Sequence, residues 1–224
     1  MGRDPKLWEL GCRDDPVRNQ VVLPDLIECV HRLSPKLIGD IGSGTGYLSR
    51  MAAAHHRDPA QWFLLERDPR MLQFASEICA AADGLEVVEY DLMNPIREWD
   101  QPLDLAFSCF SSLDFGMTRA VARRLVDLLK VQGSLLIYIP DLLEEVEQSC
   151  KLEGNLNALE FYRRGEFQVQ KPDHFTKRVE PFFADRIEKY ISNLLATGCH
   201  LQALRFLDRG SDKRIIAMEF SRVT

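Results

Sequence analysis

Apolar runs alternate with stretches of helical periodicity along the first two thirds of the chain. The runs predict strands at residues 37–39, 61–65, 85–90, 103–107 and 134–139. The helical spacing of apolar residues predicts helices at 20–33, 47–56, 69–78 and 116–130. Strands that are nearly all apolar, and that alternate with helices, are typical of a parallel sheet covered on both faces.

The last third of the chain departs from this rhythm. Residues 141–180 mix aromatic, charged and glycine residues, although EFQVQ at 166–170 could form a short strand. Helical periodicity returns over 181–196, and Gly198 stands where a helix C-cap belongs. The apolar runs 201–207 and 214–220 are joined by a short polar segment, which predicts an antiparallel hairpin at the end of the sheet.

Composition and pattern together indicate one domain over residues 1–224. Hydrophobic residues make up 46% of the chain and charged residues 28%, an ordinary balance for a globular domain. Within it we expect an N-terminal arm and helix at 1–35, and an insertion at 141–180 that precedes the last helix.

The net charge of −6 narrows the range of partners. Proteins that bind nucleic acid usually present a basic face, so we expect no nucleic-acid partner. No apolar run approaches the roughly 20 residues that span a bilayer, and the N-terminus lacks a signal-peptide pattern. We therefore expect a cytoplasmic protein without a membrane partner. The six cysteines form no C-x-x-C pair, which favours scattered reduced thiols over a metal site. A homodimer is compatible with the sequence.

The stretch KLIGDIGSGTGYLSR, residues 36–50, is the centre of the candidate chemistry. A short apolar strand is followed by a turn with three glycines, and a helix begins at once behind it. Glycine permits a positive φ and close approach of a ligand to the main chain. The unpaired N–H groups of the first helical turn point toward the same place.

The spacing within this turn argues against a dinucleotide. Dinucleotide-binding turns follow G-x-G-x-x-G, whereas here position 47 is Tyr and the third glycine comes one place early. The acidic residue, Asp40, also precedes the first glycine. A carboxylate there repels a pyrophosphate and attracts an ammonium group, so the turn suits a ligand with an amino-acid end. An ordinary tight strand-to-helix turn is the alternative.

D-I-G-S-G-T-G after an apolar strand resembles the first motif of the class I S-adenosylmethionine (SAM)-dependent methyltransferases. The resemblance extends from Leu37 to the C-terminus. It implies a Rossmann-like α/β fold with a seven-stranded, mostly parallel sheet, helices on both faces and an antiparallel terminal hairpin. It also implies SAM as cofactor and S-adenosylhomocysteine as product. In this family the turn wraps the methionine part of SAM, which assigns Asp40, Gly42, Ser43, Gly44 and Gly46 to that part.

The resemblance assigns further cofactor residues at the following strand ends. Glu66 matches the acid that binds both ribose hydroxyls, with Arg67 beside it, and DPRMLQFA at 68–75 matches the sequence that often follows. Asp91 matches the acceptor for the adenine amino group, with Leu92 beside it, and Ser108 matches the end of the fourth strand.

Each of these residues also has a structural interpretation. Asp40 and Asp91 could cap helices, and Glu66 could be a solvated charge at a strand end. Taken together, at successive carboxyl ends of a parallel sheet where such folds bind ligands, they favour a cofactor site.

Methyl transfer asks the protein mainly to position the acceptor and exclude water. A general base is needed only when the acceptor is protonated. The candidates are His174 in the insertion and Asp114 after the fourth strand. Asp114 could equally be the N-cap of the helix that begins near Gly116.

The long connection and the sequence FFADRIEKYISNLLATGC, residues 182–199, resemble small-molecule methyltransferases, in which such a connection caps the substrate cavity. The chain lacks the N/D-P-P-Y/F motif of many enzymes that methylate nucleic acid or glutamine. Candidate substrate contacts come from the arm, the fourth strand end and the insertion; they are Trp8, Arg18, Asn19, Phe110, Tyr162 and Phe175. The aromatic residues could instead pack the insertion onto the sheet.

The sequence thus predicts an enzyme that transfers a methyl group from SAM to O, N or C of a small molecule. Three alternatives stay open. A SAM-utilising enzyme of the same fold could cyclise or cleave SAM and release methylthioadenosine. The acceptor could be a protein or RNA, or the fold could serve an inactive interaction protein.

Overall fold

The computed structural model describes residues 4–56, 58–94, 99–111, 116–141, 168–172, 179–183, 185–208 and 214–223. For 168–172 and 179–183 only the backbone is considered.

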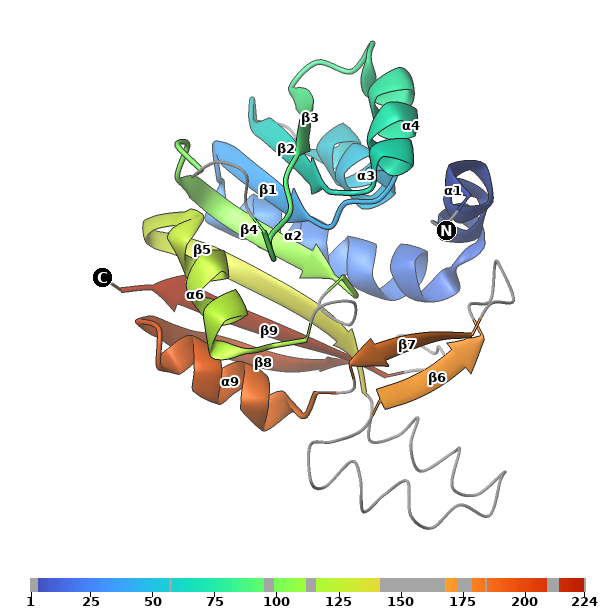
Figure 1. The fold of residues 1–224 in the computed structure, drawn as a ribbon. Helices are drawn as coiled ribbons and strands as arrows, with labels where there is room; N and C mark the ends of the chain where they lie inside the picture. Colours follow the sequence, from blue (N-terminus) through green and yellow to red (C-terminus); the bar gives the residue numbers. More distant parts are fainter. Residues whose placement is uncertain are drawn as a thin grey trace.

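A seven-stranded sheet runs through the molecule (Figure 1). Its strands are β1 (Leu37–Ile41), β2 (Gln61–Glu66), β3 (Leu85–Glu89), β4 (Leu103–Cys109), β5 (Leu129–Pro140), β8 (Cys199–Leu207) and β9 (Ile215–Arg222). The spatial order is β3-β2-β1-β4-β5-β9-β8. The first five strands pair in parallel, and β9 pairs antiparallel with both β5 and β8. The expected fold class, including the terminal hairpin, is confirmed.

Helices cover both faces of the sheet. They are α1 (Pro5–Asp14), α2 (Leu23–Leu33), α3 (Tyr47–His55), α4 (Pro69–Cys79), α6 (Arg119–Asp127) and α9 (Ile187–Leu195), with a π-helical segment η1 (Val17–Val22) between α1 and α2. α6 and α9 bury their apolar sides on one face of the sheet, while α2 and α3 bury theirs on the other. In Figure 1, α6 and α9 lie in front of the sheet and α2 lies behind it.

Local sequence explains several helix boundaries. Asp68 accepts a hydrogen bond from the backbone N–H of Arg70 and caps α4, whose first residue is Pro69, as expected from the sequence. Pro24 lies in the first turn of α2, where no intrahelical donor is needed. Gly198 adopts φ +91°, but the C-cap of α9 is Ala196, so the predicted cap position was two residues too late.

The expected helix at 116–130 is shorter than its pattern indicated. α6 ends at Asp127 and β5 already begins at Leu129, five residues before the expected strand. Leu128 and Leu129, which continued the helical pattern, are fully buried. The turn into β5 therefore buries these apolar side chains as well as a longer helix would. Gln132 adopts φ +69°, which marks the irregular start of this strand.

The expected helix at 181–196 also begins later than predicted. Val179–Phe183 forms β7, which pairs antiparallel with β6 (Gln168–Pro172), so Phe182 belongs to a strand and the prediction was wrong there. α9 starts only at Ile187. Asp185, two residues before α9, is buried, and its carboxylate accepts the N–H of Met117 at 2.5 Å, which ties the start of α9 to the segment before α6. The suggested strand at 166–170 begins two residues before β6 and overlaps it at residues 168–170.

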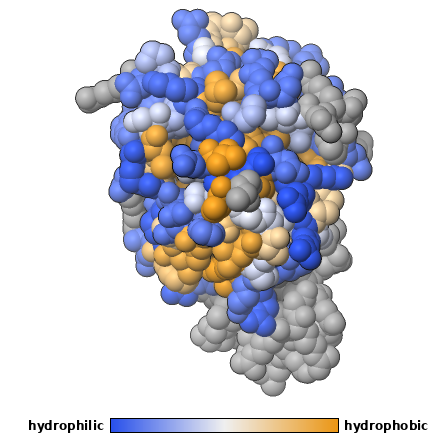
Figure 2. Space-filling model, turned by 90° about the vertical axis from the view of Figure 1, so that its left-hand side faces the viewer, coloured by the Kyte–Doolittle hydropathy of each residue, from blue (hydrophilic) through white to orange (hydrophobic). Residues whose placement is uncertain are grey.

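The two ends of the sheet differ in character. The carboxyl ends of the parallel strands point toward α1, at the right of Figure 1. Figure 2 views the opposite end, where hydrophilic residues predominate above and apolar residues gather in the lower half. Among the described helices, none combines the length and apolarity that crossing a membrane requires.

Candidate functional site

The glycine turn joins β1 to α3 at the carboxyl edge of the sheet. Gly44 and Gly46 adopt φ +58° and +73°, the left-handed region that side chains disfavour. A Cβ on Gly46 would lie 2.2 Å from Cδ2 of Leu64, and one on Gly44 would lie 2.9 Å from Nε1 of Trp8. The turn therefore needs glycine both for its conformation and for the close approach of its neighbours.

Ser43, in the middle of this turn, carries a buried hydroxyl without a hydrogen-bond partner among the described residues. The backbone N–H groups of Gly42 and Ser43 both donate to the carbonyl of Leu65, at 2.8 and 3.2 Å, so the turn is fixed to the end of β2. Buried polar atoms almost always find a partner in native proteins. An unsatisfied hydroxyl in a rigid turn is a group that a ligand can satisfy.

Asp40, near the end of β1, is 4% exposed and accepts one hydrogen bond, from Ser49 Oγ at 2.7 Å. Burial raises the pKa of its carboxyl group to about 7, and the nearby charge of Glu66 adds to this, while Arg18 opposes it. No cation lies within salt-bridge distance among the described residues. A ligand ammonium group beside Asp40 would favour the ionised carboxylate.

Glu66 ends β2 and connects it to the glycine turn. Its Oε2 accepts the N–H of Gly44 at 2.7 Å, and its Oε1 accepts the N–H groups of Arg67 and Asp68 at 2.7 and 2.9 Å. A carboxylate oxygen has two lone pairs, so Oε2 retains one acceptor position for a ligand hydroxyl. Arg67 is more exposed, and its Nη1 lies 4.0 Å from Oδ1 of Asp91.

Asp91 follows β3 and organises the turn behind it. Its Oδ1 accepts the N–H of Met93 at 2.8 Å, and the carbonyl of the buried Leu92 accepts a hydrogen bond from Arg124 Nη1 at 2.8 Å. Asp91 thus caps a turn and not a helix. Arg124, on α6, was missed by sequence reasoning because it lies 32 residues further along the chain.

Ser108 lies inside β4, one residue before its end, and not at the end as expected. Its Oγ is 2.7 Å from Oγ of Ser111, which donates in turn to the carbonyl of Ile41 at 2.6 Å. Ser111 therefore joins the ends of β4 and β1, a role that the sequence did not suggest. Between them, Phe110 adopts φ +63°, a strained conformation for an aromatic residue and one that is concentrated at functional sites.

The N-terminal arm, defined as α1 with η1, lies against this edge of the sheet. Arg18 is buried, and its guanidinium carbon lies 5.3 Å from the ring centres of both Trp8 and Phe110. Arg18 Nη1 also donates to Oδ2 of Asp15 at 2.9 Å. The structure thus brings three of the six substrate candidates, Trp8, Arg18 and Phe110, into one stack beside the glycine turn.

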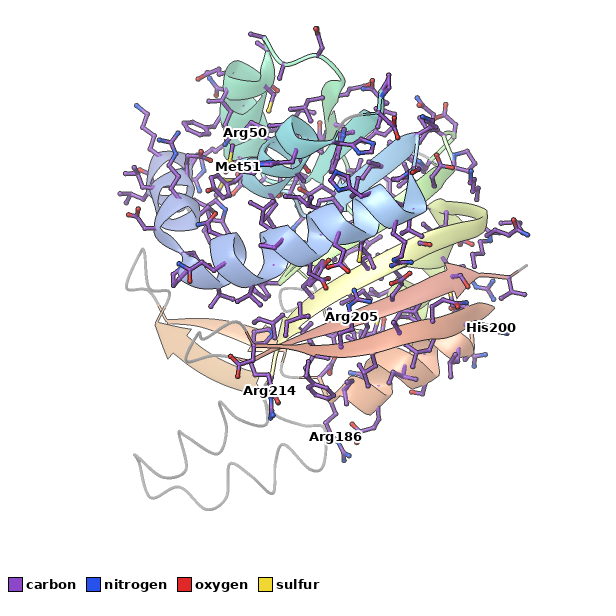
Figure 3. The ribbon with its side chains drawn as sticks, turned by 180° about the vertical axis from the view of Figure 1, so that it is seen from behind. Arg50, Met51, Arg186, His200, Arg205 and Arg214 are labelled. Atoms are coloured by element: carbon purple, nitrogen blue, oxygen red, sulfur yellow. The ribbon has the colours of Figure 1, made fainter. Side chains whose placement is uncertain are left out.

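Glu9, on α1, fastens the arm to the turn and was not identified from the sequence. It is 6% exposed and accepts hydrogen bonds from Thr45 Oγ1 at 2.7 Å and from Arg50 Nη2 at 2.6 Å. Thr45 stands between the second and third glycines, and Arg50 lies on α3 (Figure 3). No sequence pattern signals these contacts, because they join positions 36 and 41 residues apart.

Asn19 is occupied within the arm. Its Nδ2 lies 2.8 to 3.0 Å from the carbonyls of Cys12, Arg13 and Asp15, so it satisfies the end of α1. Its Oδ1 accepts the hydroxyl of Tyr47 at 2.8 Å. Four other candidates, Asp114, His174, Tyr162 and Phe175, lie outside the described residues.

A cavity of about 670 Å³ lies elsewhere, between α2 and strands β8 and β9. Four charged residues of its walls, Asp25, Arg32, Arg205 and Glu219, pair with one another. Arg205 Nη2 binds Oδ2 of Asp25 at 3.0 Å, and Arg205 Nη1 and Arg32 Nη2 bind Oε2 of Glu219 at 3.1 and 2.6 Å. No group of three metal-ligating side chains occurs in the part of the chain that the structure describes.

The sequence and the fold both match methyltransferases. Residues 38–133 match the model of a family described as a methyltransferase domain. No curated protein matches the sequence. Among solved structures, the chain is similar to a SAM-dependent methyltransferase from Clostridium acetobutylicum, with 14% identity, a TM-score of 0.63, and coverage of 90% of this chain and 91% of that one.

Two further solved structures resemble the chain over most of its length. One is a SAM-dependent methyltransferase from Aquifex aeolicus, with 12% identity, a TM-score of 0.62 and full coverage of both chains. The other is the magnesium protoporphyrin IX methyltransferase of Synechocystis with bound S-adenosylhomocysteine, with 14% identity, a TM-score of 0.60, and coverage of 90% of this chain and 81% of that one. At such identities the likeness establishes the fold, while the family match rests on the segment that contains the glycine turn and the strand-end acids.

Proposed function

We propose that this chain is a class I SAM-dependent methyltransferase, which transfers a methyl group from SAM to a small-molecule acceptor. The proposal has two parts: which residues hold the cofactor, and what kind of acceptor reaches it.

The glycine turn fits the methionine part of SAM. Within the described part of the chain, the buried hydroxyl of Ser43 has no partner and the buried carboxyl group of Asp40 has no cation beside it. Both are groups that a bound amino-acid end would satisfy. Gly44 allows the backbone to approach the ligand closely.

The following strand ends fit the nucleoside. Glu66 retains an acceptor position for a ribose hydroxyl, and Arg67 stands beside it. The segment of Asp91 and Leu92 is held by Arg124 against α6 and would border the adenine. Ser108, tied through Ser111 to the end of β1, would border the reacting end of the cofactor.

When bound, SAM supplies a methyl group that its sulfonium has already activated. The remaining tasks for this chain are to hold the acceptor atom in line with that methyl group and to exclude water. If the acceptor carries a proton, Asp114 or His174 is the general base that we propose. Residues 141–180 would form the cap, with Tyr162 and Phe175 as acceptor contacts.

The close packing of the N-terminal arm on the glycine turn is the observation that favours a small acceptor. Glu9 binds Thr45 in the turn, Trp8 packs on Gly44, and Arg18 is buried between aromatic rings. Through this packing the arm would cover one side of the proposed cofactor site. A protein or RNA acceptor would need an open groove there. The net charge of −6 agrees with this, since RNA favours a basic surface.

The first experiment is calorimetric titration of the protein with SAM and with S-adenosylhomocysteine, followed by mass analysis of the products formed from SAM with and without a panel of small molecules. We expect both ligands to bind, and S-adenosylhomocysteine to appear only when an acceptor is present. Absence of binding would contradict the cofactor assignment. Methylthioadenosine released from SAM alone would identify SAM as the substrate and would contradict methyl transfer.

A further inference from the structure

We infer that Arg18 binds the carboxylate of the cofactor's amino-acid end, and that Glu9 is the positioning residue that places Arg18 there. The N-terminal arm would thus complete the cofactor site and would not serve only to line the acceptor space. This inference rests on the proposed function, because it concerns a residue of the same site.

The position of Arg18 is fixed by contacts on both sides. On one side, the ring of Trp8 stacks on the guanidinium and its Nε1 packs against Gly44. On the other side stands the ring of Phe110, one residue before Ser111, whose Cβ lies 2.5 Å from the place that a Cβ on Gly42 would take. Arg18 is therefore held between two aromatic rings that belong to segments packed on Gly44 and Gly42 of the turn.

Arg18 has hydrogen-bonding capacity left over. A guanidinium offers five N–H donors in a planar fork. Among the described residues one of these is used, by Asp15, and the side chain as a whole is buried. Burial raises the pKa of the Cys12 thiol to about 11 and that of the Cys109 thiol to about 12, so neither neighbouring thiol supplies an anion near pH 7. A planar, weakly hydrated cation with free donors is suited to a carboxylate.

The two charges of an amino-acid end match the two buried charges at this edge. Asp40 and Arg18 lie close enough for the cation to lower the pKa of the carboxyl group, yet no hydrogen bond joins them. The ligand ammonium group would lie on the Asp40 side and the ligand carboxylate on the Arg18 side. Neither residue then loses hydration without gaining an opposite charge.

Glu9 acts on this subsite from outside. Its carboxylate accepts hydrogen bonds from Thr45 of the turn, from Arg50 of α3 and, at 3.4 Å, from Arg13, and it makes no hydrogen bond or ion pair with Arg18. Asn19 joins the end of α1 to the hydroxyl of Tyr47 on α3. Two independent contacts thus set the arm in one orientation, and that orientation determines where the guanidinium lies.

The test compares SAM with decarboxylated SAM, which lacks only the carboxylate, by equilibrium binding to the whole chain. We expect the wild-type protein to bind SAM about ten- to a hundredfold more tightly than decarboxylated SAM, the range of a charge-assisted hydrogen-bonded pair. In Arg18→Met this preference should disappear, because SAM affinity falls while the affinity for decarboxylated SAM stays or improves. Lys6→Met is the matched control, since Lys6 is an exposed cation on the same arm.

The wild-type measurement decides the matter even if Arg18→Met fails to fold. Equal affinities of the wild-type protein for the two ligands would overturn the inference and leave the proposed function intact, whereas failure to bind either ligand would overturn the proposed function itself. An equal loss for both ligands in a folded Arg18→Met variant would also overturn the assignment to the carboxylate.

Glu9→Gln tests the positioning role. We expect the preference for SAM over decarboxylated SAM to shrink several-fold, because the arm loses its ion pair with Arg50 and holds Arg18 less firmly. A merely structural Glu9 would change unfolding but leave the ratio of the two affinities unchanged, and that outcome would overturn this part of the inference.

Discussion

Two regions of the molecule bury several charged groups, and they differ in how completely these groups are paired. In the first, at the glycine turn, the residues that the structure describes give Asp40 one hydroxyl partner, give Ser43 none, and use one donor of Arg18. In the second, at the cavity between α2 and the last two strands, Asp25 accepts hydrogen bonds from Arg205 and from the hydroxyl of Tyr138. Figure 3 shows Arg205 on the sheet far from Arg50 and the turn.

The second region contains the 670 Å³ cavity, yet its charges satisfy one another. The first region has polar groups that lack a partner. The difference supports the proposed cofactor site, which is distinguished by the incomplete pairing of its buried groups and not by the volume of a cavity. Incomplete pairing destabilises the free protein and is relieved only when a ligand binds.

The largest effect is expected from a side chain in the glycine turn. Gly44→Val should abolish detectable SAM binding, because it places a β-branched residue at φ +58° and forces Trp8 out of position. Calorimetric titration measures this. Gly84→Ala is the control: Gly84 is also at positive φ, and its Cβ would lie 2.8 Å from the carbonyl of Ala60, far along β2 from the turn. Gly84→Ala should lower the free energy of unfolding and leave the SAM affinity unchanged. An equal loss of SAM binding in both variants would contradict the assignment of the turn to the SAM site.

The paired network should respond in the opposite way. Asp25→Asn leaves Arg205 without its closest carboxylate and should lower the free energy of unfolding by about 3 kcal/mol. Urea unfolding measures the change. Under conditions in which the variant is fully folded, its SAM affinity should stay at the wild-type value. A large loss of affinity would show that the two regions are coupled.

Glu66→Ala should weaken SAM binding about ten- to a hundredfold, because the ribose loses a charged acceptor. It should lower the free energy of unfolding less than Asp25→Asn does, since two of the three backbone N–H groups that Glu66 accepts, those of Arg67 and Asp68, are only part-buried and can meet water. Glu89→Ala, an exposed acid beside Glu66 on the neighbouring strand, is the control. Unchanged affinity in Glu66→Ala would remove Glu66 from the site.

The pH dependence of Asp40 is a smaller effect. Burial raises its pKa to about 7, above its unfolded value, so the folded free protein binds the extra proton between about pH 4 and 7. This contribution to the free energy of unfolding is therefore present at low pH and is lost as pH rises to 7. SAM binding should change in the other direction, and it should weaken by up to about tenfold per unit as pH falls below 7, because protonation removes the anion that meets the ammonium group.

Asp40→Asn is the matched variant for both measurements. Its SAM affinity should be low and nearly independent of pH between 5.5 and 7, where α-amino groups stay protonated. An identical pH profile in the variant and the wild-type protein would show that another group controls binding.

The smallest effect is expected at the buried tyrosine of the paired network. Tyr138→Phe removes one hydrogen bond to Asp25 while Arg205 stays in place, so the free energy of unfolding should fall by about 1 kcal/mol. Urea unfolding would detect this loss. Adding Tyr138→Phe to the Asp25→Asn variant should lower the free energy of unfolding no further. Full additivity of the two substitutions would argue that they act separately.

Much of the architecture could be predicted from local pattern. The apolar runs located all five parallel strands and the terminal hairpin, and Asp68 with Pro69 marked the start of α4. The errors fell where two structures satisfy the same apolar residues, as with Leu128 and Leu129, or where a distant contact moves a boundary, as Asp185 does at the start of α9.

The sequence by itself determined the residues that are required by their own backbone or by neighbours in the chain, such as the glycines of the turn and the acids at successive strand ends. Only the tertiary structure decided the contacts that make the turn a closed site. Glu9 meets Thr45, Ser111 meets Ile41, and Arg18 lies between Trp8 and Phe110. The reason is physical: these partners lie on different elements, and their distances depend on how helices pack on the sheet, which no local periodicity records.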